Sequence, residues 1–235
     1  MNLETIMEQL EALGTPQTKK TLGRHGIREP FFGVRIGDMK KLVKFVKNND
    51  NLSKELYSTG NYDAMYLAGL SINPSNITKE ELQQWLEQAY CDAISEYIVA
   101  GVAAESKFAL ELAREWIKSE QERVSACGWS TYSNYISITD DSILDIEEIS
   151  ELLDTIEICI HKERNRVKYA MNGFVISVGA YVVDLNEKAL EVAKRIGKVD
   201  VYMGDTCCKV PLATDYVEKI INMGRIGKKR KRCIC

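Results

Sequence analysis

The sequence predicts an all-α protein, an α-α superhelix of the HEAT or armadillo type. Nearly every periodic segment repeats its apolar residues at helical spacing, and no convincing run alternates as a strand does. In the C-terminal two thirds the expected helices come in pairs about 30–45 residues apart, which is typical of α-solenoids. Small residues recur in the second helix of each pair and allow close helix packing. Because the repeats share no strict consensus, a plain helical bundle is the alternative.

Capping residues delimit the first helices. Asn2 begins a helix that ends at Gly14, and Thr15 caps the next one, which has proline in its first turn. Thr78 and Glu81 form a capping box that starts the first regular pair. The helices expected before the pairs cover residues 2–13, 38–48, 52–58 and 62–71. The expected pairs are 79–89 with 91–104, 107–118 with 120–135, 146–160 with 164–182, and 187–197 with 212–223.

The chain of 235 residues is long enough to bury a substantial core. We expect one HEAT-like repeat solenoid domain over residues 1–224. Residues 225–235 form a tail with six basic residues between positions 225 and 232. Such a tail can follow a phosphate backbone or be a disordered end, and the sequence leaves both open.

Composition excludes several classes of function. No segment approaches 18 consecutive apolar residues, so no membrane span is expected, and the acidic N-terminus resembles no secretory signal. A cytoplasmic monomer is therefore expected. The two histidines lie far apart, and none of the seven scattered cysteines forms a C-x-x-C pair. We expect no metal site, no cofactor and no histidine-dependent catalytic triad.

The segment YCDAISEYIV (90–99) carries the most informative polar residues. An α-helix here places Asp92 and Glu96 on one face beside Ser95, with Cys91 and the isoleucines opposite. Two carboxylates on one face could be a general base, a metal site or a solvated surface, and this segment alone leaves the three interpretations open. The later second helices present cations and aromatic residues, a mixture that suits nucleic acid. Trp85, Trp116 and Trp129 are expected in the core.

Four segments together resemble the DNA alkylation repair family of HEAT-like repeat DNA glycosylases. They are GVRIGDMKKLVK (33–44), CDAIS (91–95), EWIKSEQERVSACGW (115–129) and RVKYAMNGF (166–174). The C-terminal part, residues 197–220 and the basic tail, is similar to a subgroup of that family. The resemblance covers the chain from about residue 30 onward.

The resemblance implies excision of cationic alkylated purines, such as 7-methylguanine or 3-methyladenine, from double-stranded DNA, damaged DNA included. Active members hydrolyse the N-glycosidic bond without a metal or cofactor, and an aspartate stabilises the developing sugar cation. On this chain the family's tryptophan and catalytic aspartate fall on Cys91 and Ser95. The family's basic residue falls on Arg123, and its second tryptophan on Phe174. The chain therefore resembles a divergent subgroup that lacks the usual catalytic aspartate.

Two sets of site residues follow. The candidate catalytic carboxylates are Asp92 and Glu96. The candidate DNA contacts are Tyr90, Cys91, Ser95, Arg123, Arg166, Lys168, Phe174, Lys228, Lys229 and Arg230. The function expected is DNA binding in a concave basic groove, with or without base excision. The alternative is a non-catalytic scaffold that binds DNA or proteins.

Overall fold

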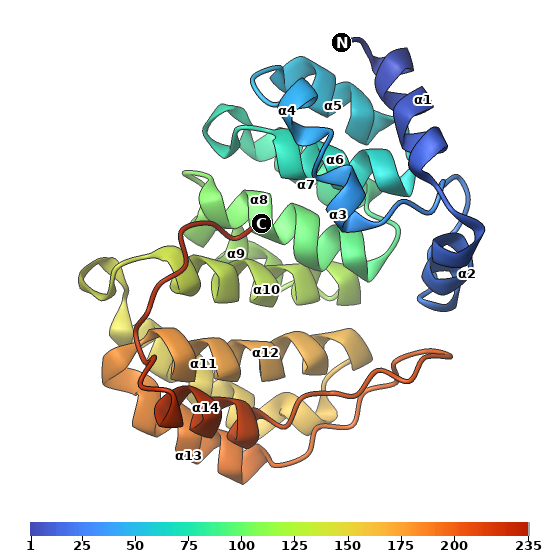
Figure 1. Cartoon of the computed structure of the whole chain (residues 1–235). Coiled ribbons are helices and arrows are strands. Elements are labelled where there is room, and N and C mark those ends of the chain that lie inside the picture. Colours follow the sequence, from blue (N-terminus) through green and yellow to red (C-terminus); the bar gives the residue numbers. More distant parts are fainter. Residues whose placement is uncertain (235) are drawn as a thin grey trace. The chain divides into compact units, whose positions relative to one another are not determined.

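A computed structural model describes residues 1–234, and Cys235 lies outside the described residues. None of residues 1–234 is in a β-strand, so the all-helical prediction is confirmed. The helices divide between two compact units (Figure 1). One unit is built from residues 1–107 with 204–207 and 234, and the other from residues 108–203 and 208–233. The single solenoid domain over residues 1–224 stays a prediction.

The first unit contains the N-terminal helices, and three of the predicted caps form. Asn2 accepts from the backbone N–H of Thr5, Thr15 accepts from that of Thr18, and Thr78 and Glu81 form the capping box. The helices are α1 (Leu3–Leu13), α2 (Pro16–Arg24), α3 (Ile36–Met39), α4 (Val43–Val46), α5 (Asp50–Ser58), α6 (Tyr62–Ser71), η1 (Pro74–Asn76), α7 (Lys79–Gln88), the π-helix η2 (Ala93–Val99) and α8 (Ala100–Glu105).

The second unit is organised around the two longest helices, α10 and α12, which run side by side (Figure 1). Its elements are α9 (Ala109–Ile117), α10 (Glu122–Ile138), η3 (Asp141–Ile143), α11 (Ile146–Cys159), η4 (Ile160–Lys162), α12 (Asn165–Tyr181), η5 (Val183–Leu185), α13 (Asn186–Ile196) and α14 (Ala213–Asn222). These bounds reproduce the predicted pairs to within about three residues. A long extended connection separates α13 from α14 (Figure 1).

Glycine allows the close packing that the small residues predicted. A Cβ at Gly128 of α10 would lie 2.5 Å from the backbone nitrogen of Ile117 on α9. In the first unit, a Cβ at Gly69 of α6 would lie 2.3 Å from Cγ2 of Ile98 on η2. Real side chains do not approach this closely, so both contacts require glycine.

Aromatic residues fill the core. The ring of Trp85 stacks on that of Tyr57 at 4.0 Å between centroids, and Trp116 and Trp129 are buried, as predicted. Phe174 is also fully buried, and it makes edge contacts with Trp129 and Tyr132. The expectation that Phe174 is presented to DNA is therefore corrected. Its ring belongs to the α10–α12 core.

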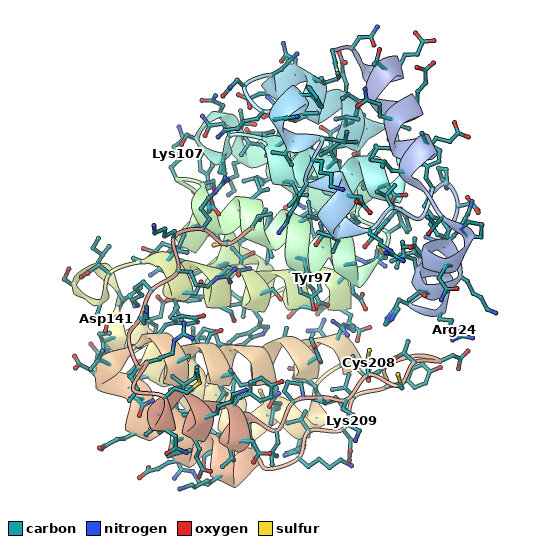
Figure 2. All side chains as sticks on the ribbon, in the orientation of Figure 1. Arg24, Tyr97, Lys107, Asp141, Cys208 and Lys209 are labelled. Atoms are coloured by element: carbon teal, nitrogen blue, oxygen red, sulfur yellow. The ribbon has the colours of Figure 1, made fainter. Side chains whose placement is uncertain are left out.

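The basic tail is held in place over its described residues. The backbone N–H groups of Gly227 and Arg230 donate to the carbonyls of Ala180 and Ser137. The Lys229 ammonium pairs with Asp141 at 2.7 Å and donates to the carbonyl of Ile136. Figure 2 labels Asp141 at the turn that follows α10. Residues in the range 227–233 therefore contact α10, α12 and the turn after α10, and Lys229 serves as an anchor in this structure.

Candidate nucleic-acid interface

The π-helix η2 changes the surface that segment 90–99 presents. Ser95 is fully buried and Glu96 is 6% exposed, whereas Tyr97 is 56% exposed. Cys91 and the isoleucines are buried, as an α-helix predicted. A π-helix has a wider turn than an α-helix, so three- and four-residue spacing no longer identifies one face. The expected exposed face of Asp92, Ser95 and Glu96 is corrected, because only Asp92 of the three keeps partial exposure.

Ser95 occupies the position that the family resemblance gives to the catalytic aspartate. Its hydroxyl donates to the backbone carbonyl of Cys91 at 3.3 Å, within its own helix. A buried hydroxyl bonded to its own helix cannot supply negative charge beside a sugar cation. Cys91 is 8% exposed, so neither of the two residues offers a surface for DNA.

Tyr90 lies just before this helix and is half-buried. Its hydroxyl donates to the carbonyl of Arg28 at 3.1 Å, and the Arg28 guanidinium lies 5.4 Å from its ring centroid. Burial, followed by the negative charges of its neighbours, raises the pKa of Tyr90, so the phenol stays neutral. Tyr90 is a partly exposed aromatic surface without charge of its own.

The first turn of α12 is fixed against the turn between α9 and α10. The Arg164 guanidinium donates to the carbonyls of Ser119, at 3.0 Å, and Glu120. The backbone N–H of Arg166 donates to the Glu122 carboxylate at 2.6 Å. Because Arg123 directly follows Glu122, these contacts bring Arg123 and Arg166 to the same end of the α10–α12 pair.

Two cations and an aromatic ring define the α10–α12 end, by which we mean Arg123, Arg166 and Tyr169. Arg123 is exposed and Arg166 is half-buried. The Arg166 guanidinium lies 4.3 Å from the centroid of Tyr169, three residues further along the same helix face. A cation on an aromatic face can approach a phosphate while the ring packs on sugar. The sequence prediction missed Tyr169, although its spacing from Arg166 was a usable signal.

Asn165 holds an aromatic residue of the extended connection, Tyr202, next to the start of α12. Its side-chain amide donates to the carbonyl of Tyr202 at 2.9 Å and accepts from the same residue's N–H at 2.7 Å. These paired hydrogen bonds hold Tyr202, which is 73% exposed, beside the start of α12. No sequence signal marked either residue, because their pairing joins positions 37 apart.

The remaining predicted cations lie on another face of α12 or in the C-terminal tail. Lys168 is two residues from Arg166, about 200° around the helix, and its charge helps to lower the pKa of Asp200 after the larger effect of Lys198. Arg230 is half-buried and donates to the carbonyl of Cys233 at 2.7 Å, whereas Lys228 is exposed. The structure therefore does not group Lys168 with Arg166.

The described part of the chain has neither a metal cluster nor a membrane span. Within residues 1–234, no three His, Cys, Asp or Glu side chains gather as a metal ion would require. In the same range, no helix has the length and apolar character needed to cross a membrane.

Comparison with a solved structure identifies the class of fold to which this chain belongs. A solved structure superposes over 100% of both chains, with a TM-score of 0.93 and 38% sequence identity. It represents a family of proteins related to the HEAT-like repeat DNA glycosylases, with affinity for branched DNA structures. The fold is thus of the HEAT-like repeat DNA glycosylase class, which confirms the predicted superhelical fold class.

The family follows from the sequence match. The DNA alkylation repair enzyme family matches residues 6–199, and the chain belongs to it. Uncharacterized protein Lin0241 of Listeria innocua is 37% identical over 94% of this chain and 98% of its own length. Uncharacterized protein Lmo0209 of Listeria monocytogenes matches with the same identity and coverage.

Proposed function

We propose that this protein binds double-stranded DNA through its sugar-phosphate backbone, prefers branched DNA, and does not excise bases. The observation that carries the proposal is the α10–α12 end, where Arg123 and Arg166 lie at the same end of the helix pair and the Arg166 guanidinium lies over the Tyr169 ring. The affinity of a relative, 38% identical over its whole length, for branched DNA supports this proposal. The concave basic groove stays a prediction.

The proposal against base excision rests on Ser95. Catalysis at a cationic base needs a negative charge close to the developing sugar cation. The family position for that charge holds a buried serine, and Glu96 is buried as well. Of the two candidate carboxylates, only Asp92 keeps partial exposure. Base excision through Asp92 is therefore the second candidate function.

A base-release assay separates the two candidates. DNA carrying 7-methylguanine is incubated with the wild-type protein, Asp92→Asn and Glu96→Gln, and the free base is quantified. We expect no release above the protein-free rate for any of the three. Release by the wild-type protein that Asp92→Asn abolishes would establish the excision function instead.

A binding assay tests the DNA proposal. Fluorescence anisotropy with a labelled four-way junction and a linear duplex of the same length gives both affinities. We expect tighter binding to the junction, with both affinities falling steeply as salt rises, because phosphate contacts release counterions. Binding that is absent or insensitive to salt would favour the protein-interaction scaffold.

A further inference from the structure

Positive charge is concentrated in residues 15–49 of the first unit. This segment contains nine Lys or Arg residues and two acidic residues, a formal charge of +7 in a chain whose net charge is −3. The basic residues are Lys19, Lys20, Arg24, Arg28, Arg35, Lys40, Lys41, Lys44 and Lys47. The rest of the chain is therefore acidic, with a net charge of −10. A locally basic surface on an acidic protein indicates a polyanionic partner.

Most of this charge is not neutralised within the protein. All nine side chains are exposed except that of Lys19, which is half-buried. Lys19 pairs with Glu29 at 2.9 Å, and Lys41 pairs with Asp38 at 2.7 Å. Across residues 1–234, no ion pair within 4.0 Å involves Lys20, Arg24, Arg35, Lys40, Lys44 or Lys47. We call these six residues the N-terminal basic surface.

Helical spacing puts the cations on outward faces. In the α3–α4 stretch, Met39, Leu42 and Val46 are buried. Lys40, Lys44 and Lys47 repeat at the same three- and four-residue spacing on the exposed side. On α2, Lys20 and Arg24 are one turn apart, and Figure 2 shows Arg24 at the exposed end of this helix.

An aromatic ring accompanies the lysines. Phe45 is 39% exposed, and the Lys44 ammonium lies 4.7 Å from the centroid of its ring. Lys44 and Phe45 therefore form a cation–aromatic pair in the first unit. Arg166 and Tyr169 form a pair of the same kind in the second unit. Both arrangements place a cation and an aromatic face where a sugar-phosphate backbone can contact them.

Asp63 fixes the segment that joins α2 to α3. Its fully buried carboxylate accepts from the backbone N–H groups of Phe32, Gly33 and Val34, at 2.6, 3.1 and 2.9 Å. Helix α2 packs directly on this loop, since a Cβ at Gly33 would lie 2.7 Å from the backbone nitrogen of Lys19. The loop between α2 and α3 is thus fixed, and little backbone ordering is needed there for binding.

We propose that the N-terminal basic surface is a second DNA-binding surface, which holds one duplex arm of a branched DNA while the α10–α12 end holds another. The inference rests on the proposed function and deepens it. A linear duplex can be held by one surface alone. A second, linked surface converts the next contact into an intramolecular one and raises affinity without any change at the first surface.

DNA suits this surface better than an anionic membrane does. A helix that binds membranes buries a broad apolar face in the lipid interface. Between residues 15 and 49 the exposed large apolar side chains are Ile36 and Phe45, while Met39, Leu42 and Val46 face inward. The surface therefore presents charge with one aromatic ring, as phosphate recognition requires.

Two triple variants test the inference. The surface variant carries Arg24→Gln, Lys40→Gln and Lys44→Gln. The control carries Lys194→Gln, Lys219→Gln and Arg225→Gln, which removes the same charge from exposed positions on or just after α13 and α14. Thermal melting of each protein checks that both remain folded, and anisotropy gives the affinities for a four-way junction and a linear duplex.

We expect the surface variant to bind the junction at least about tenfold more weakly than the control, with less than about a threefold change for the linear duplex. An equal loss for both DNAs, or no difference from the control, would overturn the two-arm proposal. So would a loss of binding to phosphatidylserine vesicles with junction affinity intact. A wild-type protein that binds neither DNA contradicts the proposed function itself, a result distinct from these.

Discussion

Arg164 and Arg166 stand two residues apart at the start of α12 and have different roles. The Arg164 guanidinium is bonded to carbonyls in the turn between α9 and α10, whereas that of Arg166 lies over the Tyr169 ring. Sequence spacing could not distinguish the roles of Arg164 and Arg166, because both are basic residues at the start of a helix. The difference between their roles depends on a turn that lies 44 residues away in the sequence from Arg164.

The two arginines give a paired prediction. Arg164→Ala should lower the free energy of unfolding by about 1–3 kcal/mol, since it removes charged hydrogen bonds to two carbonyls. Arg166→Ala should weaken DNA binding and reduce the slope of log affinity against log salt by about 1. Urea denaturation and a salt titration of each variant check both effects. Equal effects of the two variants in either measurement would contradict the assigned roles.

Glu148 connects stability to pH within the second unit. Its carboxylate accepts two hydrogen bonds of 2.7 Å from Arg114 and one from the Tyr132 hydroxyl. The Arg114 hydrogen bonds hold the pKa of Glu148 below its usual range, and the Tyr132 bond adds to the effect. A carboxyl with a lowered folded-state pKa stabilises the fold above its unfolded pKa and loses that effect as pH falls.

We therefore expect Glu148→Gln to be less stable than the wild-type protein at pH 7 by about 1–3 kcal/mol. The difference should persist down to the unfolded pKa of about 4.3 and shrink at lower pH. Denaturant unfolding across pH 3–7 measures it, with Glu147→Gln on the exposed side of the same turn as control. A difference that grows on acidification would rule out this account.

At the scale of elements, the bounds of the helices were predictable from the sequence. Which face of each helix is exposed was predictable only in part. Three- and four-residue apolar spacing and the caps at Asn2, Thr15 and Thr78 gave the helix bounds. The π-helix was not predictable, because three- and four-residue apolar spacing describes an α-helix and does not mark the hydrogen-bond pattern of a π-helix. Phe174 was misplaced for a related reason. Helical spacing defines a face but does not say which face a neighbouring helix covers.

The basic charge of residues 15–49 could have been found in the sequence. Its lysines and arginines are spread over short helices and a loop, so no dense run marks them. The denser C-terminal run drew the prediction instead. In the structure Lys229 of that run is tied to Asp141, and Arg230 is bonded to Cys233. A dense run of basic residues in the sequence does not by itself show which of its side chains are already bonded within the protein.

Asp63 should be a main stabilising residue of the first unit. Asp63→Ala leaves three backbone N–H groups without their acceptor, two of them buried, at a cost of about 1–3 kcal/mol for each buried group. Asp63→Asn keeps one acceptor oxygen and should cost less. Urea denaturation and amide exchange at Phe32, Gly33 and Val34 report the change, with Glu8→Gln as an exposed control. Unchanged exchange in Asp63→Ala would disprove the anchoring role.

The basic tail provides a matched pair of neighbouring lysines. Lys229 is bonded to Asp141 and the Ile136 carbonyl, whereas Lys228 is exposed. We expect Lys229→Met to lower the free energy of unfolding by about 1–3 kcal/mol, and Lys228→Met to stay within about 0.5 kcal/mol of wild type. Thermal melting compares them directly. The reverse order would show that the tail is not anchored through Lys229.

At the scale of the whole molecule, the family match does not bring with it the carboxylate that the family resemblance expects. The chain matches the DNA alkylation repair enzyme family over residues 6–199, yet the position resembling the family's catalytic aspartate holds the buried Ser95. Cations are nevertheless present in both units, on α10 and α12 in one and on α2 to α4 in the other. This pattern fits a fold that keeps contacts to the DNA backbone after the catalytic carboxylate has been replaced.

The central claim is that the α10–α12 end binds DNA phosphates, and one salt titration tests it most directly. The affinity for a four-way junction is measured from about 50 to 200 mM salt for the wild-type protein and for Arg123→Gln/Arg166→Gln. We predict a steep linear fall of log affinity for the wild type. The slope of the double variant should be smaller by about 1.8, because each phosphate that an arginine neutralises adds about 0.9 to the slope. Equal slopes for the two proteins would contradict the claim.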